Sequence, residues 1–262
     1  MSPFVPEAIL AMLSVADMSW RPILSAGLQA IADATPDYLP ALAADDYLPT
    51  KGRLFAAFSL PLDDVRYVLV GEGPYPRADS ATGVCFMDGA VGSLWSEKGL
   101  SKQVNRATSL RNFIKMLLVA KGELSIEQTN GDAIMHVSSK AHAVDSPFIQ
   151  TLPELQANLI AHGFLLLNAT LVFRPHVPPI KDAKAWQPFL HTVLSALADR
   201  AEQKARVLPT LVLWGKVAEQ LNALPPTSRF PKAVAEHPYN LSFIANPTMQ
   251  ALFGSMDLLM KR

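Results

Sequence analysis

The sequence predicts an α/β fold: a three-layer α/β/α arrangement with a short central parallel sheet. Four short apolar runs, at 65–71, 163–173, 209–215 and 232–238, are typical of strands that are buried on both faces. The segments between several of these runs carry apolar residues at helical spacing. Strands that alternate with helices predict a parallel sheet that is covered on both sides.

Helices are predicted on both sides of the second strand. The segment 109–122, "SLRNFIKMLLVAKG", has Ser109 as its expected N-cap and Gly122 as its stop signal, and 182–204 repeats the helical spacing over a greater length. Residues 1–60 are interpreted as a helical part that packs beside the sheet. Residues 122–150 are polar and show little periodicity, so we expect a loop insertion there.

Length and composition favour one domain over residues 1–262, since the chain is 50% hydrophobic and long enough to bury a full core. The single cysteine, Cys85, excludes an internal disulfide and a four-cysteine zinc or iron–sulfur site, and it fits a reducing cytoplasm. The N-terminus lacks a basic signal-peptide region, and no apolar stretch reaches the roughly 18 residues of a membrane span. We expect a cytoplasmic monomer with no membrane contact.

The overall charge argues neither for nor against binding of nucleic acid, because 23 basic and 23 acidic residues cancel to a formal net charge of zero. A phosphate-binding surface must therefore be local. In an open parallel sheet, ligands bind outside the carboxyl ends of the strands. At those ends the chain places polar residues: Glu72 between two glycines, Asn168, Lys216 and His237. A carboxylate, an amide and an imidazole at one crevice predict a functional site.

The same residues lie in five segments that, in order from about 65 to about 243, resemble the motifs of the uracil-DNA glycosylase superfamily. They are "GEGPYPRADSATGVCF", "SLRNFIKML", "GFLLLNATLVFRP", "LVLWGKVAEQ" and "HPYNLS". Each segment alone is a weak signal, but five in register are a strong one. The resemblance implies the fold predicted above, with a site for a base in DNA and with neither a metal nor another cofactor.

The first motif departs from the family pattern. The classical motif is Gly-Gln-Asp-Pro-Tyr-His, whereas this chain has Gly71-Glu72-Gly73-Pro74-Tyr75-Pro76, so that the water-positioning Asp and the His are both absent. The Glu-Gly-Pro core is similar to the iron–sulfur branch of the superfamily, which needs four cysteines. The chain therefore looks like a hybrid without a cluster.

The resemblance assigns a role to each residue of the base site. Cleavage of an N-glycosidic bond places positive charge on the sugar and negative charge on the departing base. Glu72 is expected to stabilise the sugar cation and orient water, and His237 to donate to the uracil carbonyl. The substrate-binding residues are expected to be Gly71, Gly73, Tyr75 against C5 of the base, Phe86 stacked on the base, and Asn168 as the amide that selects uracil.

DNA itself is expected to contact a second group of residues. Leu241 lies where the family has a wedge that fills the vacated base stack, and Ser242 would bind phosphate. Ser109, Arg174 and Lys216 are further predicted phosphate contacts, because each follows a strand or begins a helix near the crevice.

The predicted function is removal of uracil, or of a related deaminated base, from DNA. Two alternatives remain open from the sequence. Gly73 and Pro76 replace the classical Asp and His, which favours a catalytically silent DNA-binding member. The zero net charge favours a protein that binds a nucleoside or nucleotide without DNA, although Leu241 at the wedge position argues against that reading.

Overall fold

The computed structural model describes residues 4–222 and 224–262. Four strands form one sheet in the order β4–β1–β5–β6. These are β1 (Tyr67–Gly71), β4 (Phe164–Asn168), β5 (Thr210–Trp214) and β6 (Lys232–Ala235). All four predicted strands are therefore present, and the expected run at 163–173 ends as a strand at Asn168.

The sheet is parallel and flanked by helices, as the sequence predicts. β1 and β4 pair in parallel, with Tyr67 opposite Phe164 and Gly71 opposite Asn168. Leu211 donates its N–H to Pro231 and Gly215 donates to Ala235, so β5 and β6 also advance in the same direction. Every residue of β4 is buried, as expected for a strand that is covered on both faces.

The chain divides into two compact units. The first comprises residues up to Asp88 together with Gly163–Val212 and Val217–Lys232, and the second comprises Gly89–His162, Leu213–Lys216 and Ala233–Arg262. Helices of the first unit are α1 (Glu7–Ala11), α2 (Arg21–Ala34), α3 (Tyr38–Ala43), α8 (Pro179–Gln203) and α9 (Lys216–Asn222). The first residue of α9, Lys216, is assigned to the second unit. Its short 3₁₀ helices are η1 (Met12–Val15), η2 (Met18–Trp20), η3 (Arg53–Ser59), η4 (Leu62–Asp64) and η5 (Pro225–Arg229).

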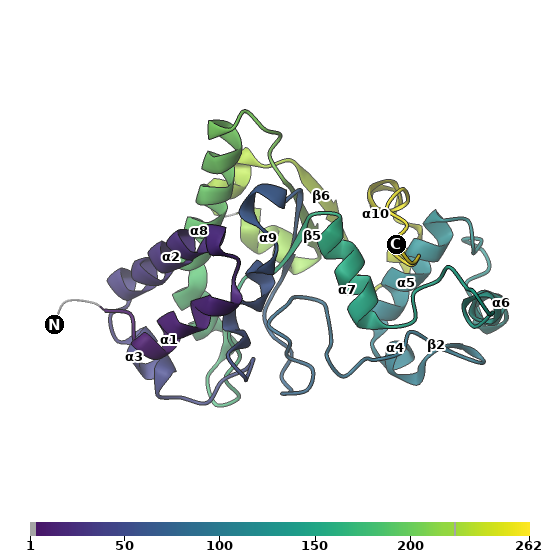
Figure 1. Cartoon of the computed structure of the whole chain (residues 1–262), viewed down its shortest axis with the longest axis horizontal. Coiled ribbons are helices and arrows are strands. Elements are labelled where there is room, and N and C mark those ends of the chain that lie inside the picture. The colour runs from purple at the N-terminus through teal and green to yellow at the C-terminus, as the bar shows by residue number, and fades with distance from the viewer. Residues whose placement is uncertain (1–3, 223) are drawn as a thin grey trace. The chain divides into compact units, whose positions relative to one another are not determined.

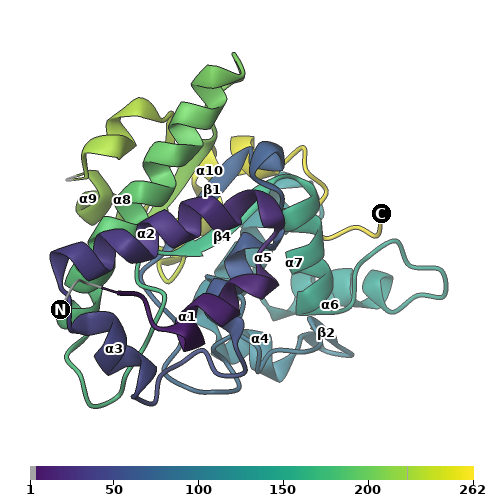
Figure 2. The same ribbon diagram turned by 60° about the vertical axis from the view of Figure 1, so that its left-hand side comes forward.

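In the first unit, the predicted N-terminal helical part packs on α8. α2 runs alongside α8 in both views (Figures 1 and 2). Leu24, Leu28 and Ile31 recur at helical spacing on α2, and all three are fully buried. Phe189 of α8 meets Phe58 of η3 edge to face, with 6.1 Å between the ring centroids. This apolar contact fixes α8, whose first turn borders the cavity described below.

The second unit contains α4 (Lys102–Arg106), α5 (Thr108–Ala120), α6 (Gly131–Ala141), α7 (Leu152–Ala161), η6 (Leu241–Ala245) and α10 (Pro247–Phe253), with a small antiparallel hairpin of β2 (Trp95–Ser96) and β3 (Gly99–Leu100). α5 packs against η6 and α10. It begins one residue before Ser109, which is not its N-cap, because Ala107 holds that position. Gly122, at φ +79°, follows the end of the helix as expected.

The segment 122–150 is not the loop that the sequence predicted throughout, because it contains α6. Asn130 caps this helix by accepting the N–H of Ala133 at 3.1 Å. Ile134, Val137 and Ala141 are buried at helical spacing. The helical spacing of apolar residues is present in the sequence, but it extends over three turns only. The polar residues on either side of it make the whole segment look non-periodic.

Candidate active site

The turn after β1 is joined to the segment after β4 by backbone hydrogen bonds. Ala169 donates its N–H to the Gly71 carbonyl at 2.8 Å, and Thr170 donates to the Glu72 carbonyl at 3.1 Å. These bonds extend the β1–β4 pairing beyond the sheet edge. The Glu72 turn and the Asn168 strand end, which the sequence placed at one crevice, are therefore neighbours in the first unit.

Asn168 lies against Gly71, and the fit between them excludes any larger residue at position 71. A Cβ atom on Gly71 would lie 2.8 Å from Asn168 Oδ1 and 3.0 Å from Cys85 Cβ. Asn168 is only 3% exposed, and within the part of the chain that the structure describes no residue hydrogen-bonds with its amide. The Ser80 hydroxyl is the one fully buried side-chain polar atom without a partner among the described residues, so the Asn168 amide still reaches accessible space, where a ligand or water can supply its hydrogen bonds.

Phe86 has a strained backbone. Its φ is +65°, and the N–H of Met87 donates to the Cys85 carbonyl across it at 2.8 Å, which together define a classic γ-turn. Tyr75 reaches this turn from the first motif and donates its hydroxyl to the Phe86 carbonyl at 3.3 Å. The structure thus brings Tyr75 and Phe86 together, and burial raises the pKa of Tyr75, which keeps its hydroxyl protonated as a donor.

Two residues that the sequence analysis did not assign hold the same turn. The Thr82 hydroxyl accepts the N–H of Val84 at 3.2 Å and donates to the Met87 carbonyl at 3.0 Å. The thiol of Cys85 is buried and donates to the Leu69 carbonyl of β1 at 3.2 Å. Burial raises the pKa of this thiol, so it is a packing group and not a nucleophile. No pattern in the sequence indicates that the Thr82 hydroxyl or the Cys85 thiol holds this turn.

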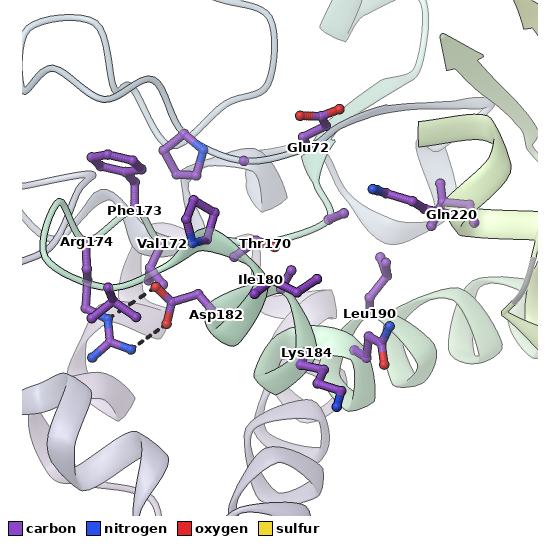
Figure 3. A pocket seen from close by; sticks show the side chains of 18 of the residues that line it. Glu72, Thr170, Val172, Phe173, Arg174, Ile180, Asp182, Lys184, Leu190 and Gln220 are labelled. Atoms are coloured by element: carbon purple, nitrogen blue, oxygen red, sulfur yellow. Dashed lines mark hydrogen bonds and ion pairs between the residues drawn. The ribbon is translucent and has the colours of Figure 1, made fainter. Parts of the chain in front are cut away.

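A cavity of about 510 Å³ opens beside the Glu72 turn, entirely within the first unit. Its walls come from the first motif, the segment after β4, the first turns of α8, and α9. Figure 3 shows Glu72 at one side and Lys184 at the other. Glu72 is exposed, and none of the described residues hydrogen-bonds with its carboxylate. The carboxylate is therefore available to a ligand in the cavity.

In the second unit, His237 follows β6 and has a defined tautomer. The backbone N–H of Tyr239 donates to His237 Nδ1 at 3.1 Å. Nδ1 is therefore an acceptor, and the neutral ring carries its proton on Nε2. Gly215 makes room for this residue, because at φ +58° a Cβ there would lie 2.9 Å from His237 Cβ. His237 can act as a hydrogen-bond donor through Nε2.

The predicted DNA contacts of the second unit lie at or near the surface. Leu241 is 69% exposed, as a wedge residue must be. Lys216 and Ser242 are exposed, and Ser109 is half-buried in the first turn of α5. Ser242 also has a partner near the loop, because its side chain hydrogen-bonds with the Glu236 carboxylate. Burial raises the pKa of Glu236, but the hydrogen bonds from Ser242, the Glu236 backbone and Asn246 have the larger effect, so the pKa of this carboxyl is lowered.

Arg174 is a correction to the sequence analysis. It was predicted to contact a DNA phosphate, but it is buried and paired with two carboxylates. It bonds Asp182 at 2.5 Å through Nη2 and Asp45 at 3.0 Å through Nη1, and the hydrogen bond with Asp182 raises its pKa. Figure 3 shows it turned towards Asp182. Its charge holds the segment after β4 against the N-terminal part and is not exposed to a phosphate.

Residues 4–222 and 224–262 contain no group of three or more His, Cys, Asp or Glu side chains arranged to hold a metal ion. None of the helices in those ranges is long and apolar enough to cross a membrane.

Comparison with known proteins identifies the family. The uracil-DNA glycosylase of Parafrankia sp. (strain EAN1pec) is 30% identical over 230 residues, which cover 83% of this chain and 82% of that protein. The uracil-DNA glycosylase of Mycobacterium sp. (strain KMS) is 28% identical over 249 residues and covers 94% of this chain and 88% of its own length. No protein-family model matches the chain.

Solved structures agree. The wild-type UNG crystal structure from Nitratifractor salsuginis has a TM-score of 0.86 and 39% sequence identity, over 98% of each chain. Mimivirus uracil-DNA glycosylase, at 15% identity and a TM-score of 0.54 over 89% of this chain and 73% of its own, shares the fold. The predicted three-layer α/β/α fold is thereby confirmed, and the chain belongs to the uracil-DNA glycosylase family.

Proposed function

We propose that the protein is a DNA base-excision repair glycosylase that hydrolyses the N-glycosidic bond of uracil, or of a related deaminated base, in DNA. The observation that carries the proposal is the Asn168 amide: the residue is only 3% exposed, and its amide has no hydrogen-bond partner among the described residues. An amide can accept from uracil N3–H and donate to O4. Cytosine reverses this pattern and leaves buried polar groups unpaired.

The proposed reaction uses charge and not a cofactor. The bond between C1′ of the sugar and N1 of the base breaks, and its electron pair leaves with the base. Glu72 stabilises the positive charge on the sugar and orients a water molecule, which adds to C1′; the proton that this water loses balances the negative charge of the departed base. His237 donates from Nε2 to the uracil carbonyl that gains negative charge. The tautomer set by the Tyr239 N–H supports this role.

The proposal also assigns the remaining parts of the site. Phe86 stacks on the flipped base, Tyr75 faces C5, and Gly71 and Gly73 lie against the substrate. Leu241 fills the vacated base stack, and Ser109, Lys216 and Ser242 contact phosphates. We further infer that residues 1–262 act as one domain and that the enzyme is a monomer in the cytoplasm, which sedimentation and cell fractionation would test.

A test of the function is a single-turnover uracil-release assay on a single-stranded oligonucleotide and on a U·G duplex, followed by alkaline cleavage of the abasic product. We expect release from at least one substrate and none from the same strands with cytosine in place of uracil. Binding of both DNAs with no release would contradict catalysis.

The silent DNA-binding alternative keeps one specific observation in its favour: Gly73 stands where the classical motif has a catalytic Asp. Gly73→Asp separates the two readings. A Cβ at position 73 would lie 3.5 Å from the Thr170 carbonyl oxygen, an ordinary contact, so the backbone there accepts a side chain without a clash at Cβ. If wild type is inactive and Gly73→Asp alone restores release, the silent reading is correct. If wild type is active, the silent reading is wrong, and the Glu72→Gln variant then tests the role of the carboxylate.

A further inference from the structure

The loop that carries His237 and Leu241 is tied to α5 by one buried side chain. Asn112 is 0% exposed. Its Nδ2 lies 2.8 Å from the carbonyl oxygen of Pro238, 3.2 Å from that of Tyr239 and 3.4 Å from that of Asn240. A single amide group therefore gathers three consecutive carbonyls of the segment 238–240, which is more than 120 residues away in sequence.

Of the residues 237–241 around this contact, Pro238 is buried and the other four are exposed. His237 directly precedes the three carbonyls and Leu241 directly follows them. Tyr239 and Leu241 are 66% and 69% exposed, so their side chains contribute little packing to hold the loop. Within the loop, Asn240 donates its N–H to the His237 carbonyl at 2.9 Å, and at its base Asn246 donates to Glu236 at 2.8 Å. Asn112 adds the contact from the helix side.

The chemistry of the contact requires an amide donor. Three carbonyls that face one point need hydrogen-bond donors there, and a buried carbonyl without one costs about 1–3 kcal/mol. Asparagine supplies two N–H donors, whereas an ionised aspartate supplies none. The contact also fixes the orientation of the loop backbone. Because the carbonyls of residues 238–240 point towards α5, the backbone on either side of them is held in one orientation.

We propose that Asn112 is a positioning residue that arranges the loop 237–241 before DNA binds, so that His237 Nε2 and the Leu241 side chain are already in their working orientations. The inference rests on the proposed function of His237 and Leu241. The physical advantage is entropic. The exposed loop is already ordered when the protein folds, so DNA binding does not have to supply the free energy of ordering it, and the affinity is higher.

The chain offers a matched control in the same unit. Asn158 on α7 is also buried, at 6% exposure, and its Nδ2 donates to the carbonyls of Leu258 at 2.9 Å and Met260 at 2.8 Å. Asn112 and Asn158 thus perform the same task, in which a helical amide holds a backbone segment. Only the segment held by Asn112 carries residues of the proposed site.

The experiment compares Asn112→Leu with Asn158→Leu, since leucine has nearly the shape of asparagine but no polar atoms. We expect both variants to lose thermal stability. At a temperature where both remain folded, Asn158→Leu should release uracil at the wild-type single-turnover rate, and Asn112→Leu should be slower by about 10²-fold, as misplacement of a catalytic group predicts. Equal rates in the two variants would overturn the proposal.

A second measurement does not depend on catalysis. Hydrogen exchange of the free protein should become faster at the 239–243 amides in Asn112→Leu and remain at the wild-type level there in Asn158→Leu. If wild type releases no uracil, the proposed function fails, while this measurement still tests the positioning role. Unchanged exchange in Asn112→Leu refutes the positioning role even in an active enzyme. If a leucine variant does not fold, the pair Asn112→Ala and Asn158→Ala replaces it.

Discussion

Phe86 shows how individual residues hold this site in place. A classic γ-turn at a bulky residue costs about 1–3 kcal/mol and persists only where its surroundings enforce it. Here the hydroxyls of Tyr75 and Thr82 bond to the carbonyls of the turn. Strained residues cluster at functional sites, and the role proposed for Phe86, stacking on a flipped base, needs a ring that is fixed before the base arrives.

The carboxylate of Glu72 is expected to act on the rate and not on binding. Glu72→Gln keeps the shape of the side chain but removes its charge, so the single-turnover rate should fall by about 10²-fold, or about 3 kcal/mol, with DNA affinity little changed. His237→Ala should cost a comparable factor. The rates are measured at saturating enzyme and the affinity by titration. Wild-type activity in Glu72→Gln would refute the assignment.

The Tyr75 hydroxyl should matter separately from its ring. Tyr75→Phe removes the donor to the Phe86 carbonyl, and we expect a loss of about 1 kcal/mol in the free energy of unfolding together with slower uracil release. Tyr67→Phe is the control, because the Tyr67 hydroxyl has no hydrogen-bond partner among the described residues. The ring of Tyr67 stacks on Phe164, and a phenylalanine ring would keep that contact. Equal behaviour of the two variants in denaturant titrations would contradict the role of the hydroxyl.

At the scale of elements, an ion cluster joins η4, which leads into β1, to the end of α8. Asp63 accepts from Arg200 at 2.9 and 3.0 Å and also from Lys204. Hydrogen bonds from these two residues lower the pKa of Asp63 well below its ordinary value. The cluster therefore stabilises the approach of α8 to the strand whose far end carries Glu72.

The pH dependence of this cluster has a definite sign. Because the folded pKa of Asp63 is lowered, its stabilisation is complete above the ordinary aspartate pKa of about 3.9 and is lost as pH falls towards the folded value. Asp63→Asn should lower Tm by about 2–4 °C at pH 7, as expected for a loss of about 1 kcal/mol at a partly exposed site. The difference from wild type should shrink as pH falls below about 4. Calorimetry across this range checks it, and a constant difference would contradict it.

For the molecule as a whole, the zero net charge means that DNA binding must come from a few local cations. The structure changes which cations these are. Lys216 is exposed, while Arg174 is enclosed by Asp45 and Asp182. The two residues looked equivalent in the sequence, since both follow a strand, but only Lys216 retains a charge that a phosphate can reach.

The salt dependence of DNA affinity measures this difference. The slope of log affinity against log salt is about −0.9 for each phosphate neutralised on B-DNA, so Lys216→Ala should make the slope shallower by about 0.9. Arg174→Ala should leave the slope unchanged but destabilise the protein by about 3–5 kcal/mol, because it removes the cation that is paired with the buried Asp182 carboxylate. A flat salt response of the wild type would favour the nucleoside-binding alternative.

The sequence by itself determined the four strands, the two principal helices, the three-layer fold and the family. These features are local: runs of apolar residues, helical spacing and motifs such as "GEGPYP" and "HPYNLS" are each contained within a short window. The positions of Glu72 and Asn168 were also predictable, because parallel strands end at the same edge of a sheet. Their backbone connection through Ala169 and Thr170 agrees with that rule.

Only the tertiary structure decided which side chains meet across long distances in sequence. Arg174 pairs with Asp45, 129 residues away, and so is withdrawn from DNA. Asn112 meets the carbonyls of the His237 loop, and Tyr75 meets Phe86 through a backbone conformation that no residue pattern announces. Hydrogen bonds and ion pairs depend on separations of a few ångströms, which are set by how the elements pack and not by the residue types alone.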